Sequence, residues 1–213
     1  FSPEHFVQIK EGKIYTYPMK GTKDASQANA MEALMDDRKE QAEHATIVDL
    51  MRNGLSMIST DVKVEKYRYL EKIETERSEL LQTSSKISGR LTSNYQENIG
   101  TILSKLLPAG SISGAPKLST RHIIEAAEIE QRGYYTGVFG YFDGQELHSS
   151  VMIRFIEKIA DQMYYRSGGG LTAQSDLTKE YQELIQKIYV PICREYQSSQ
   201  RENSTTEITS GSF

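Results

Sequence analysis

The sequence predicts an α+β fold in which antiparallel sheets are flanked by helices. Short runs of alternating apolar residues come in pairs joined by turn residues, as in β-hairpins, and long helical stretches separate these pairs. Such an order differs from the regular strand–helix alternation that builds parallel sheets. The 213 residues, 38% of them hydrophobic and 25% charged, are ordinary for a globular protein and sufficient to enclose a core.

In the N-terminal half, the apolar spacing of Ile47, Leu50 and Met51 indicates a helix, which Asn53-Gly54 should end. The predicted elements, in order, are a hairpin (residues 5–9 and 14–17) ending at Pro18, a helix (26–55), an extended segment (61–73) and a stretch of mixed structure (74–101).

In the C-terminal half, Pro116 suits the first turn of a helix that should stop at Gly133, and Asp143-Gly144 suits a two-residue hairpin turn. The predicted elements are a loop (108–117), that helix, three antiparallel strands (134–142, 147–156 and 163–166) and a last helix from about 177, with Leu177, Tyr181, Leu184 and Ile188 on one face. We expect one domain over residues 1–196 and a polar, disordered tail over 197–213.

Charge and cysteine content exclude several classes of function and partner. A formal charge of −4 argues against nucleic acid or anionic lipid as the main partner, and no apolar run has the roughly 18 residues that a membrane span needs. The single cysteine, Cys193, excludes an internal disulfide and fits a reducing compartment, so we expect a cytoplasmic protein. Because the chain starts at Phe1 without methionine, we expect it to be the later part of a longer protein.

Lys20 is the first candidate for chemistry. Pairing across the first hairpin would place Glu4 opposite Met19 or Lys20, which would join a carboxylic acid to an amine. A surface ion pair between the two strands, without a catalytic role, is the alternative.

Two pairs of glutamates form the second candidate. Glu40 and Glu43 share one face of the first predicted helix, and Glu180 and Glu183 share one face of the last. Four carboxylates without nearby histidine or cysteine match the oxygen ligands that Mg²⁺ prefers, although a solvated helix face has the same pattern.

The third candidate is a carboxylate-binding group. Hairpin pairing places Tyr135 opposite Met152 and Arg154 on the same face, and a turn at Ala160-Asp161 would bring Arg154 opposite Ser167, beside Gly168–Gly170. A bidentate arginine, a phenol and accessible backbone amides suit a carboxylate. A chance cross-strand Tyr–Arg pair remains open.

The short sequence motifs given at the end of this paragraph occur in the same order as in the chorismate-utilising enzyme family, and this sequence resembles that family over residues 1 to about 192. The resemblance implies most of a chorismate-binding domain of the anthranilate synthase component I type, incomplete at its N-terminus. The matching strings are Ser-Pro-Glu at 2–4, Pro-Met-Lys-Gly-Thr at 18–22, Ile-Val-Asp-Leu-Met-Arg-Asn at 47–53, Gly-Ser-Ile-Ser-Gly-Ala-Pro-Lys at 110–117, Arg154, Gly168–Gly170 and Glu-Tyr-Gln-Glu at 180–183.

Within that family the residue at the position of Lys20 distinguishes two activities, because anthranilate synthases carry alanine there and aminodeoxychorismate synthases carry lysine. The resemblance therefore implies formation of 4-amino-4-deoxychorismate, for p-aminobenzoate and folate, from chorismate and ammonia supplied by a glutamine amidotransferase subunit. It implies Lys20 as nucleophile, Glu4 as general acid, and Mg²⁺ held by Glu43 and Glu183, with Glu40 and Glu180 assisting. The implied substrate contacts are Gly21, Thr22, Tyr135, Arg154, Gly168, Gly170 and Lys187.

The chain departs from the family pattern at four positions. Gly54 replaces the usual aspartate, Gln82 a frequent histidine, Ala109 a glycine and Phe155 a threonine. Two alternatives therefore stay open: anthranilate synthesis or another chorismate-utilising activity on the same scaffold, and a catalytically incomplete fragment that only binds a ligand or a partner.

Overall fold

The computed structural model describes residues 4–74, 79–172, 175–186 and 188, and it confirms the α+β fold with antiparallel sheets. The chain divides into a larger unit, Pro3–Ile153, and a smaller unit, Arg154–Phe213 with Phe1–Ser2. Among the described residues, none of the helices is both long and apolar enough to cross a membrane.

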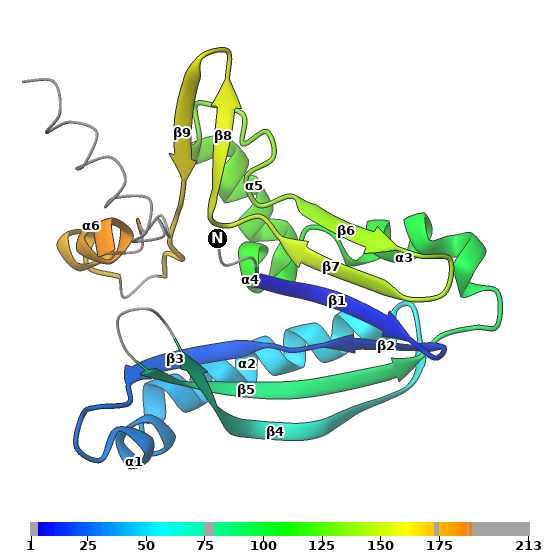
Figure 1. Cartoon of the computed structure of the whole chain (residues 1–213), viewed down its shortest axis with the longest axis horizontal. Helices are drawn as coiled ribbons and strands as arrows, with labels where there is room; N and C mark the ends of the chain where they lie inside the picture. The colour runs from blue at the N-terminus through cyan, green and yellow to red at the C-terminus, as the bar shows by residue number, and fades with distance from the viewer. Residues whose placement is uncertain (1–3, 75–78, 173–174, 187, 189–213) are drawn as a thin grey trace, which may run out of the picture. The chain divides into compact units, whose positions relative to one another are not determined.

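One antiparallel sheet organises the larger unit (Figure 1). Its central strand is β5, which pairs with β4 along one edge and with β2 and β3 along the other. The order is β3-β5-β2-β1-β7-β6, built from β1 (Glu4–Lys10), β2 (Lys13–Thr16), β3 (Met19–Asp24), β4 (Thr60–Glu74), β5 (Glu79–Arg90), β6 (Val138–Phe142) and β7 (Leu147–Val151).

The first hairpin forms as predicted, with Gln8 opposite Tyr15, but it does not continue to Lys20. Proline has no N–H to donate to a ladder, and the strand breaks before Pro18. Beyond the break, β3 pairs with β5, while Glu4 lies opposite Val151 of β7. The predicted pairing of Glu4 with Met19 or Lys20 is therefore wrong.

Two helices, α1 (Ala30–Met35) and α2 (Arg38–Ser56), replace the single helix predicted over residues 26–55. The Asp37 side chain accepts hydrogen bonds from the amides of Lys39 and Glu40, which starts α2 at that point. The helix continues through Gly54, because Leu55, only 1% exposed, is part of the core.

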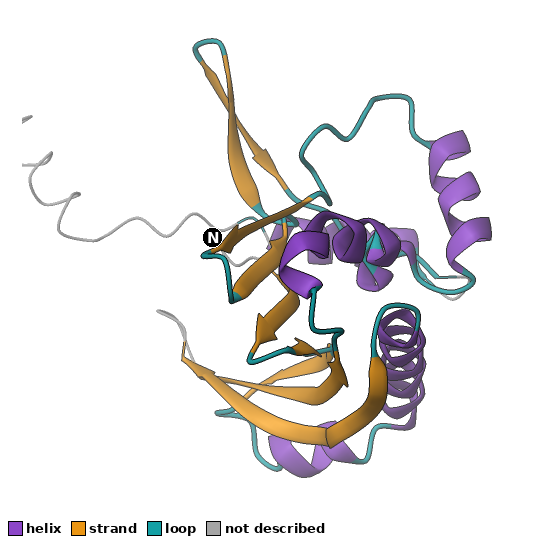
Figure 2. Cartoon of the chain, turned by 90° about the vertical axis from the view of Figure 1, so that its right-hand side faces the viewer, coloured by secondary structure: helices purple, strands orange, loops and turns teal. Residues whose placement is uncertain are grey.

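The main core lies between α2 and one face of the sheet, and Figure 2 shows α2 running along that curved face. Ile14, Val48 and Ile87 are among its buried side chains. Residues 74–101, for which mixed structure was expected, contain β5, the 3₁₀ helix η1 (Tyr95–Asn98) and the start of α3 (Ile99–Leu106); α4 (Gly110–Ser113) and α5 (Lys117–Ala127) follow. The helix predicted to reach Gly133 thus ends at Ala127.

The β6–β7 hairpin has a longer turn than predicted. Phe142 pairs with Leu147, and the Asp143 carboxylate accepts hydrogen bonds from the amides of Gln145 and Glu146, which stabilises a four-residue turn. The ladder ends at Val138, so Tyr135 lies in the preceding loop rather than opposite Met152 in a strand. That part of the predicted pairing is wrong.

The smaller unit contains a two-stranded sheet and a helix. Strand β8 (Phe155–Ile159) pairs with β9 (Gln162–Arg166) about the predicted Ala160-Asp161 turn, and α6 (Leu177–Gln186) begins where it was expected. The predicted strand over residues 147–156 is therefore two strands, β7 and β8, interrupted after Val151. The predicted tail at 197–213 lies outside the described residues.

Candidate active site

Lys20, on strand β3, and Glu43, on helix α2, lie next to each other. The Lys20 Nζ atom lies 3.2 Å from the Glu43 Oε2 atom, and the Nζ of Lys39 lies 3.8 Å from Glu43 Oε1. The Lys20 and Glu43 side chains are 45% and 33% exposed, so their ion pair contributes at most about 1 kcal/mol and can separate. A candidate nucleophile and a candidate metal ligand, far apart in the sequence, thus share one site.

A bulge at Gly21 shapes the chain beside Lys20. Lys20 pairs with Thr83 and Thr22 pairs with Gln82, which leaves Gly21 unmatched. Gly21 has a φ of +77°, and a Cβ atom there would lie 2.9 Å from Leu34 Cδ1 and 3.0 Å from Glu40 Oε2. Only glycine accommodates both the backbone conformation and the close approach of the Glu40 carboxylate.

Side chains of β5 hold this bulge on both sides. The Thr83 hydroxyl donates a hydrogen bond to the Lys20 carbonyl, and Gln82 Nε2 donates to Thr22 Oγ1 at 3.4 Å. Gln82 occupies the position where many relatives were expected to carry histidine. Here its amide is used to contact Thr22, one of the predicted substrate-binding residues.

The carboxylates fit Mg²⁺ by their chemistry. Glu40 and Glu43 project from one stretch of α2, Glu40 toward Gly21 and Glu43 toward Lys20. Oxygen donors of this kind suit a small, hard cation. Within the described residues, three or more His, Cys, Asp or Glu side chains do not gather anywhere as a complete metal site. Glu43 and Glu40 would therefore be part of a ligand set that needs further donors.

The smaller unit brings together two other groups of predicted site residues. Glu180 Oε1 accepts a hydrogen bond from Ser175 Oγ at 2.7 Å, and a Cβ atom at Gly169 would lie 3.9 Å from Glu180 Oε2. The glycine loop at 168–170 therefore runs beside the helix that carries Glu180 and Glu183. Lys187 lies outside the described residues.

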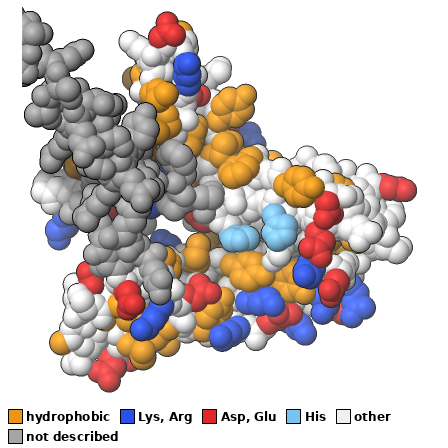
Figure 3. Space-filling model, viewed as in Figure 1, with side chains coloured by type: hydrophobic (Ala, Val, Ile, Leu, Met, Phe, Trp, Pro, Cys, Tyr) orange, Lys and Arg blue, Asp and Glu red, His pale blue; other side chains and the backbone are white. Residues whose placement is uncertain are grey.

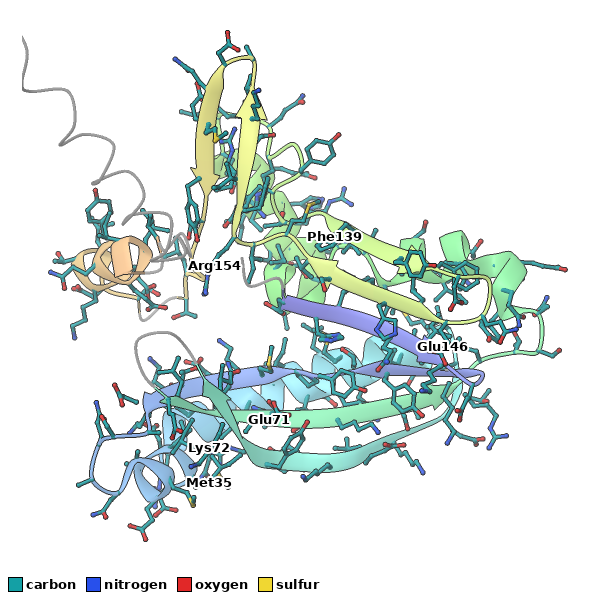
Figure 4. All side chains as sticks on the ribbon, in the orientation of Figure 1. Met35, Glu71, Lys72, Phe139, Glu146 and Arg154 are labelled. Carbon is teal, nitrogen blue, oxygen red and sulfur yellow. The ribbon has the colours of Figure 1, made fainter. Side chains whose placement is uncertain are left out.

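Arg154 directly precedes β8 (Figure 4), and Ser167 directly follows β9. The pairing of Phe155 with Arg166 confirms the predicted strand register, and the ladder ends there, one residue short of Arg154 and Ser167. That Arg154 lies beside the glycine loop stays a prediction. Tyr135, in the larger unit, lies in the loop before β6, and its ring centroid is 5.7 Å from the Arg132 guanidinium. Its convergence with Arg154 stays a prediction.

A buried polar group beside Glu43 was not anticipated. His44 is fully buried, and its Nε2 atom lies 2.7 Å from Ser85 Oγ. Burial, followed by the charge of Arg68, lowers the pKa of His44 to about 4, so the ring is neutral at pH 7. The signal in the sequence was the helical spacing of His44 with the core residues Ile47 and Val48.

Comparison with known proteins places the chain in a family. An uncharacterised PabA-like protein of Pasteurella multocida is 59% identical over 90% of this chain and 59% of its own length. Aminodeoxychorismate synthase component 1 of Bacillus subtilis is 33% identical, over 88% of this chain and 40% of its own length. The crystal structure of anthranilate synthase component I from Streptococcus pneumoniae gives a TM-score of 0.75 at 34% identity, over 87% of this chain and 41% of that one.

The chain thus spans no more than 59% of the length of these relatives. Residues 1–192 match the family described as chorismate binding enzyme, and this range includes all the described residues of both units. Together with the conserved type of fold and the ordered motifs, this match shows that the chain belongs to the chorismate binding enzyme family.

Proposed function

We propose that the protein is a transferase that converts chorismate and ammonia into 4-amino-4-deoxychorismate, the precursor of p-aminobenzoate for folate. The observation that carries the proposal is the position of Lys20, an amine nucleophile 3.2 Å from a carboxylate suited to Mg²⁺. Relatives named for anthranilate and for aminodeoxychorismate synthesis have nearly equal identities, 34% and 33%, so overall identity does not separate the two activities. Lys20 favours the second, because the first class was expected to carry alanine.

In this proposal Lys20 adds to C2 of chorismate as the bond between C4 and its hydroxyl breaks, and the ring double bonds C1=C2 and C5=C6 move to C1=C6 and C4=C5. Glu4, at the start of β1, gives the leaving hydroxyl a proton, so that water departs. Ammonia then attacks C4 and gives a proton back to the Glu4 carboxylate, both double bonds return, and the bond between C2 and the Lys20 nitrogen breaks. The lysine is regenerated and the net change replaces a hydroxyl by an amino group.

Mg²⁺ would be held by Glu43 and Glu183, with Glu40 and Glu180 assisting, and when bound it offsets the charge of the substrate's ring carboxylate. Tyr135, Arg154 and the amides around Gly168 and Gly170 would hold the enolpyruvyl carboxylate, with Lys187 as a further cation. Gly21 and Thr22 would line the ring. The polarity of each group suits a small dianionic substrate, and none of these contacts requires a basic surface overall.

Ammonia would come from a glutamine amidotransferase subunit in the cytoplasm. The relatives named "component 1" carry that designation themselves, and it supports a second component for this chain only by similarity. If this chain alone lacks part of the fold, it would bind chorismate or a partner without turning chorismate over, which is the alternative that an activity measurement has to separate.

The test is product analysis. The protein is incubated with chorismate, ammonium and Mg²⁺, and products are identified by mass spectrometry for the wild type, Lys20→Ala and Lys23→Ala. Lys23 is a matched control because it lies on the same strand and donates to the Ala33 carbonyl, 3.1 Å away. We expect 4-amino-4-deoxychorismate from the wild type and Lys23→Ala and none from Lys20→Ala. Anthranilate as the product, or no turnover by a folded wild-type sample, would overturn the proposal.

A further inference from the structure

Three buried residues behind the Lys20–Glu43 pair form a hydrogen-bonded group, here called the His44 cluster: His44 of α2, Ser85 of β5 and Arg68 of β4. Ser85 Oγ lies 2.7 Å from His44 Nε2 and accepts a hydrogen bond from the Arg68 backbone N–H at 2.9 Å. His44 and Ser85 are 0% exposed and Arg68 is 9% exposed. Among the described residues, the buried His44 Nδ1 and Arg68 Nε atoms have no hydrogen-bond partner, so the contact with Ser85 Oγ is what orients the His44 ring.

The cluster sits at a second bulge in the sheet. Lys66 pairs with Lys86 and Tyr69 with Ser84, so two residues of β4, including Arg68, lie opposite Ser85 alone. Arg68 has a φ of +46°, and its guanidinium turns to the end of α1, where it donates to the carbonyls of Leu34 and Met35 at 3.0 and 2.9 Å. Bulges of this kind redirect side chains and are common beside active sites.

Each member of the cluster contacts an element that places Lys20 or Glu43. His44 follows Glu43 on α2, and the Ser85 N–H donates to the Pro18 carbonyl at 2.9 Å, two residues before Lys20. Arg68 fixes the end of α1, whose Leu34 side chain packs against Gly21. Ser85 therefore joins all three elements: its backbone N–H contacts the strand break, and its hydroxyl contacts His44 of α2 and the backbone of Arg68, whose guanidinium contacts α1.

We propose that the His44 cluster is a positioning group that holds the Lys20 amine and the Glu43 carboxylate in register for the reaction proposed above. The catalytic purpose of this group rests on the proposed function. The dependence of the Lys20–Glu43 contact on the hydrogen bonds of the His44 cluster does not rest on it. His44 acts through Ser85 and Glu43 and is not assigned contact with the substrate.

The experiment compares two substitutions of similar shape, His44→Gln and His44→Met. Both remove the edge contact of the imidazole with the Tyr67 ring, and only glutamine retains a polar group that can reach Ser85. The readout is the rate at which Lys20 is acylated by a water-soluble ester, measured by peptide mass spectrometry relative to Lys23 in the same molecule. An amine released from its ion pair reacts faster, so we expect the Lys20 to Lys23 ratio to rise at least threefold in His44→Met and to stay within twofold of wild type in His44→Gln.

Ser149→Ala is the control for general destabilisation. Ser149 is also a buried strand serine, and its hydroxyl donates to the Val7 carbonyl at 2.7 Å on β1, away from β3. It should lower the melting temperature without changing the ratio, whereas Ser85→Ala should change it as His44→Met does. Equal ratios in the glutamine and methionine variants, or an equal rise in Ser149→Ala, would overturn the positioning role.

Turnover separates this inference from the proposed function. If the wild type aminates chorismate, His44→Met should lower kcat at least tenfold while changing KM for chorismate less than twofold, and His44→Gln should restore most of kcat. A loss confined to KM would count against positioning of the reacting groups. If no sample turns over but the labelling ratios behave as expected, the proposed function fails and the positioning of Lys20 by the cluster stands.

Discussion

The buried His44 should make stability depend on pH between about 4 and 6.5. Its pKa in the folded protein is about 4, below the ordinary value of 6.5, because the ring is removed from water and lies near the Arg68 charge. A group whose folded pKa is lowered favours folding above its unfolded pKa, and that contribution is lost as the pH falls through the folded pKa. At pH 4.5 nearly every unfolded chain would carry the proton, against about a quarter of folded chains.

These populations correspond to a loss of about 2 kcal/mol between pH 7 and pH 4.5 from this one residue. The assay is urea unfolding of the wild type and His44→Gln at both pH values, because the variant lacks the titrating ring while other groups titrate equally in both proteins. The free energy of unfolding of the wild type should fall relative to that of the variant by about 2 kcal/mol. A pH-independent difference for His44 would refute the reasoning, since it would mean that the ring is hydrated or already charged in the folded protein.

Three further predictions concern stability. Gly21→Ala should cost about 1–3 kcal/mol more than Gly12→Ala in urea unfolding, because both glycines have positive φ but only Gly21 has side chains within 3 Å of a new Cβ atom. Asp37→Ala removes the cap of α2 and should lower the free energy of unfolding by about 1 kcal/mol; an unchanged midpoint would mean that the cap is not used in solution. Leu55→Ala, at a side chain 1% exposed, should cost about 2–5 kcal/mol, whereas Leu118→Ala, at one 64% exposed, should cost little in the same urea-unfolding assay.

Local patterns were sufficient for part of the fold. The first hairpin, the extended segment at β4, the β8–β9 turn and the start of α6 each follow from turn residues or apolar spacing within a short window. The pairing of Phe155 with Arg166 could be predicted because a two-residue turn sets the register of the strands that it joins. The four-residue turn at Asp143 could not, because its side-chain hydrogen bonds extend a turn that the dipeptide alone suggests is shorter.

Strand β5 shows why the rest was missed. Only Leu81 and Ile87 of its inward positions are apolar, while Thr83 and Ser85 face inward as hydrogen-bonding groups. An apolar periodicity of two is therefore absent from the strand on which the sheet depends. The other face of β5 is polar as well. Ser84 donates a hydrogen bond at 2.6 Å to Glu71, a residue labelled in Figure 4, and Lys86 forms an ion pair with Glu65 at 2.9 Å. Figure 3 shows basic and acidic side chains mixed along this part of the surface.

The candidate site was identified by ordered resemblance to a family, and its geometry required β5. Counting residue pairs outward from the turn of the first hairpin places Lys20 near Glu4, because this counting assumes that the second strand continues past Pro18. Ser85 and Thr83 instead bind the carbonyls of Pro18 and Lys20 on either side of the break, which transfers β3 to the central strand. That transfer turns Lys20 toward α2 and Glu43. The placement of the proposed nucleophile is thus a property of a polar central strand, so substitutions that make β5 more apolar, which would ordinarily favour a strand, should displace Lys20 even where the sheet itself is retained.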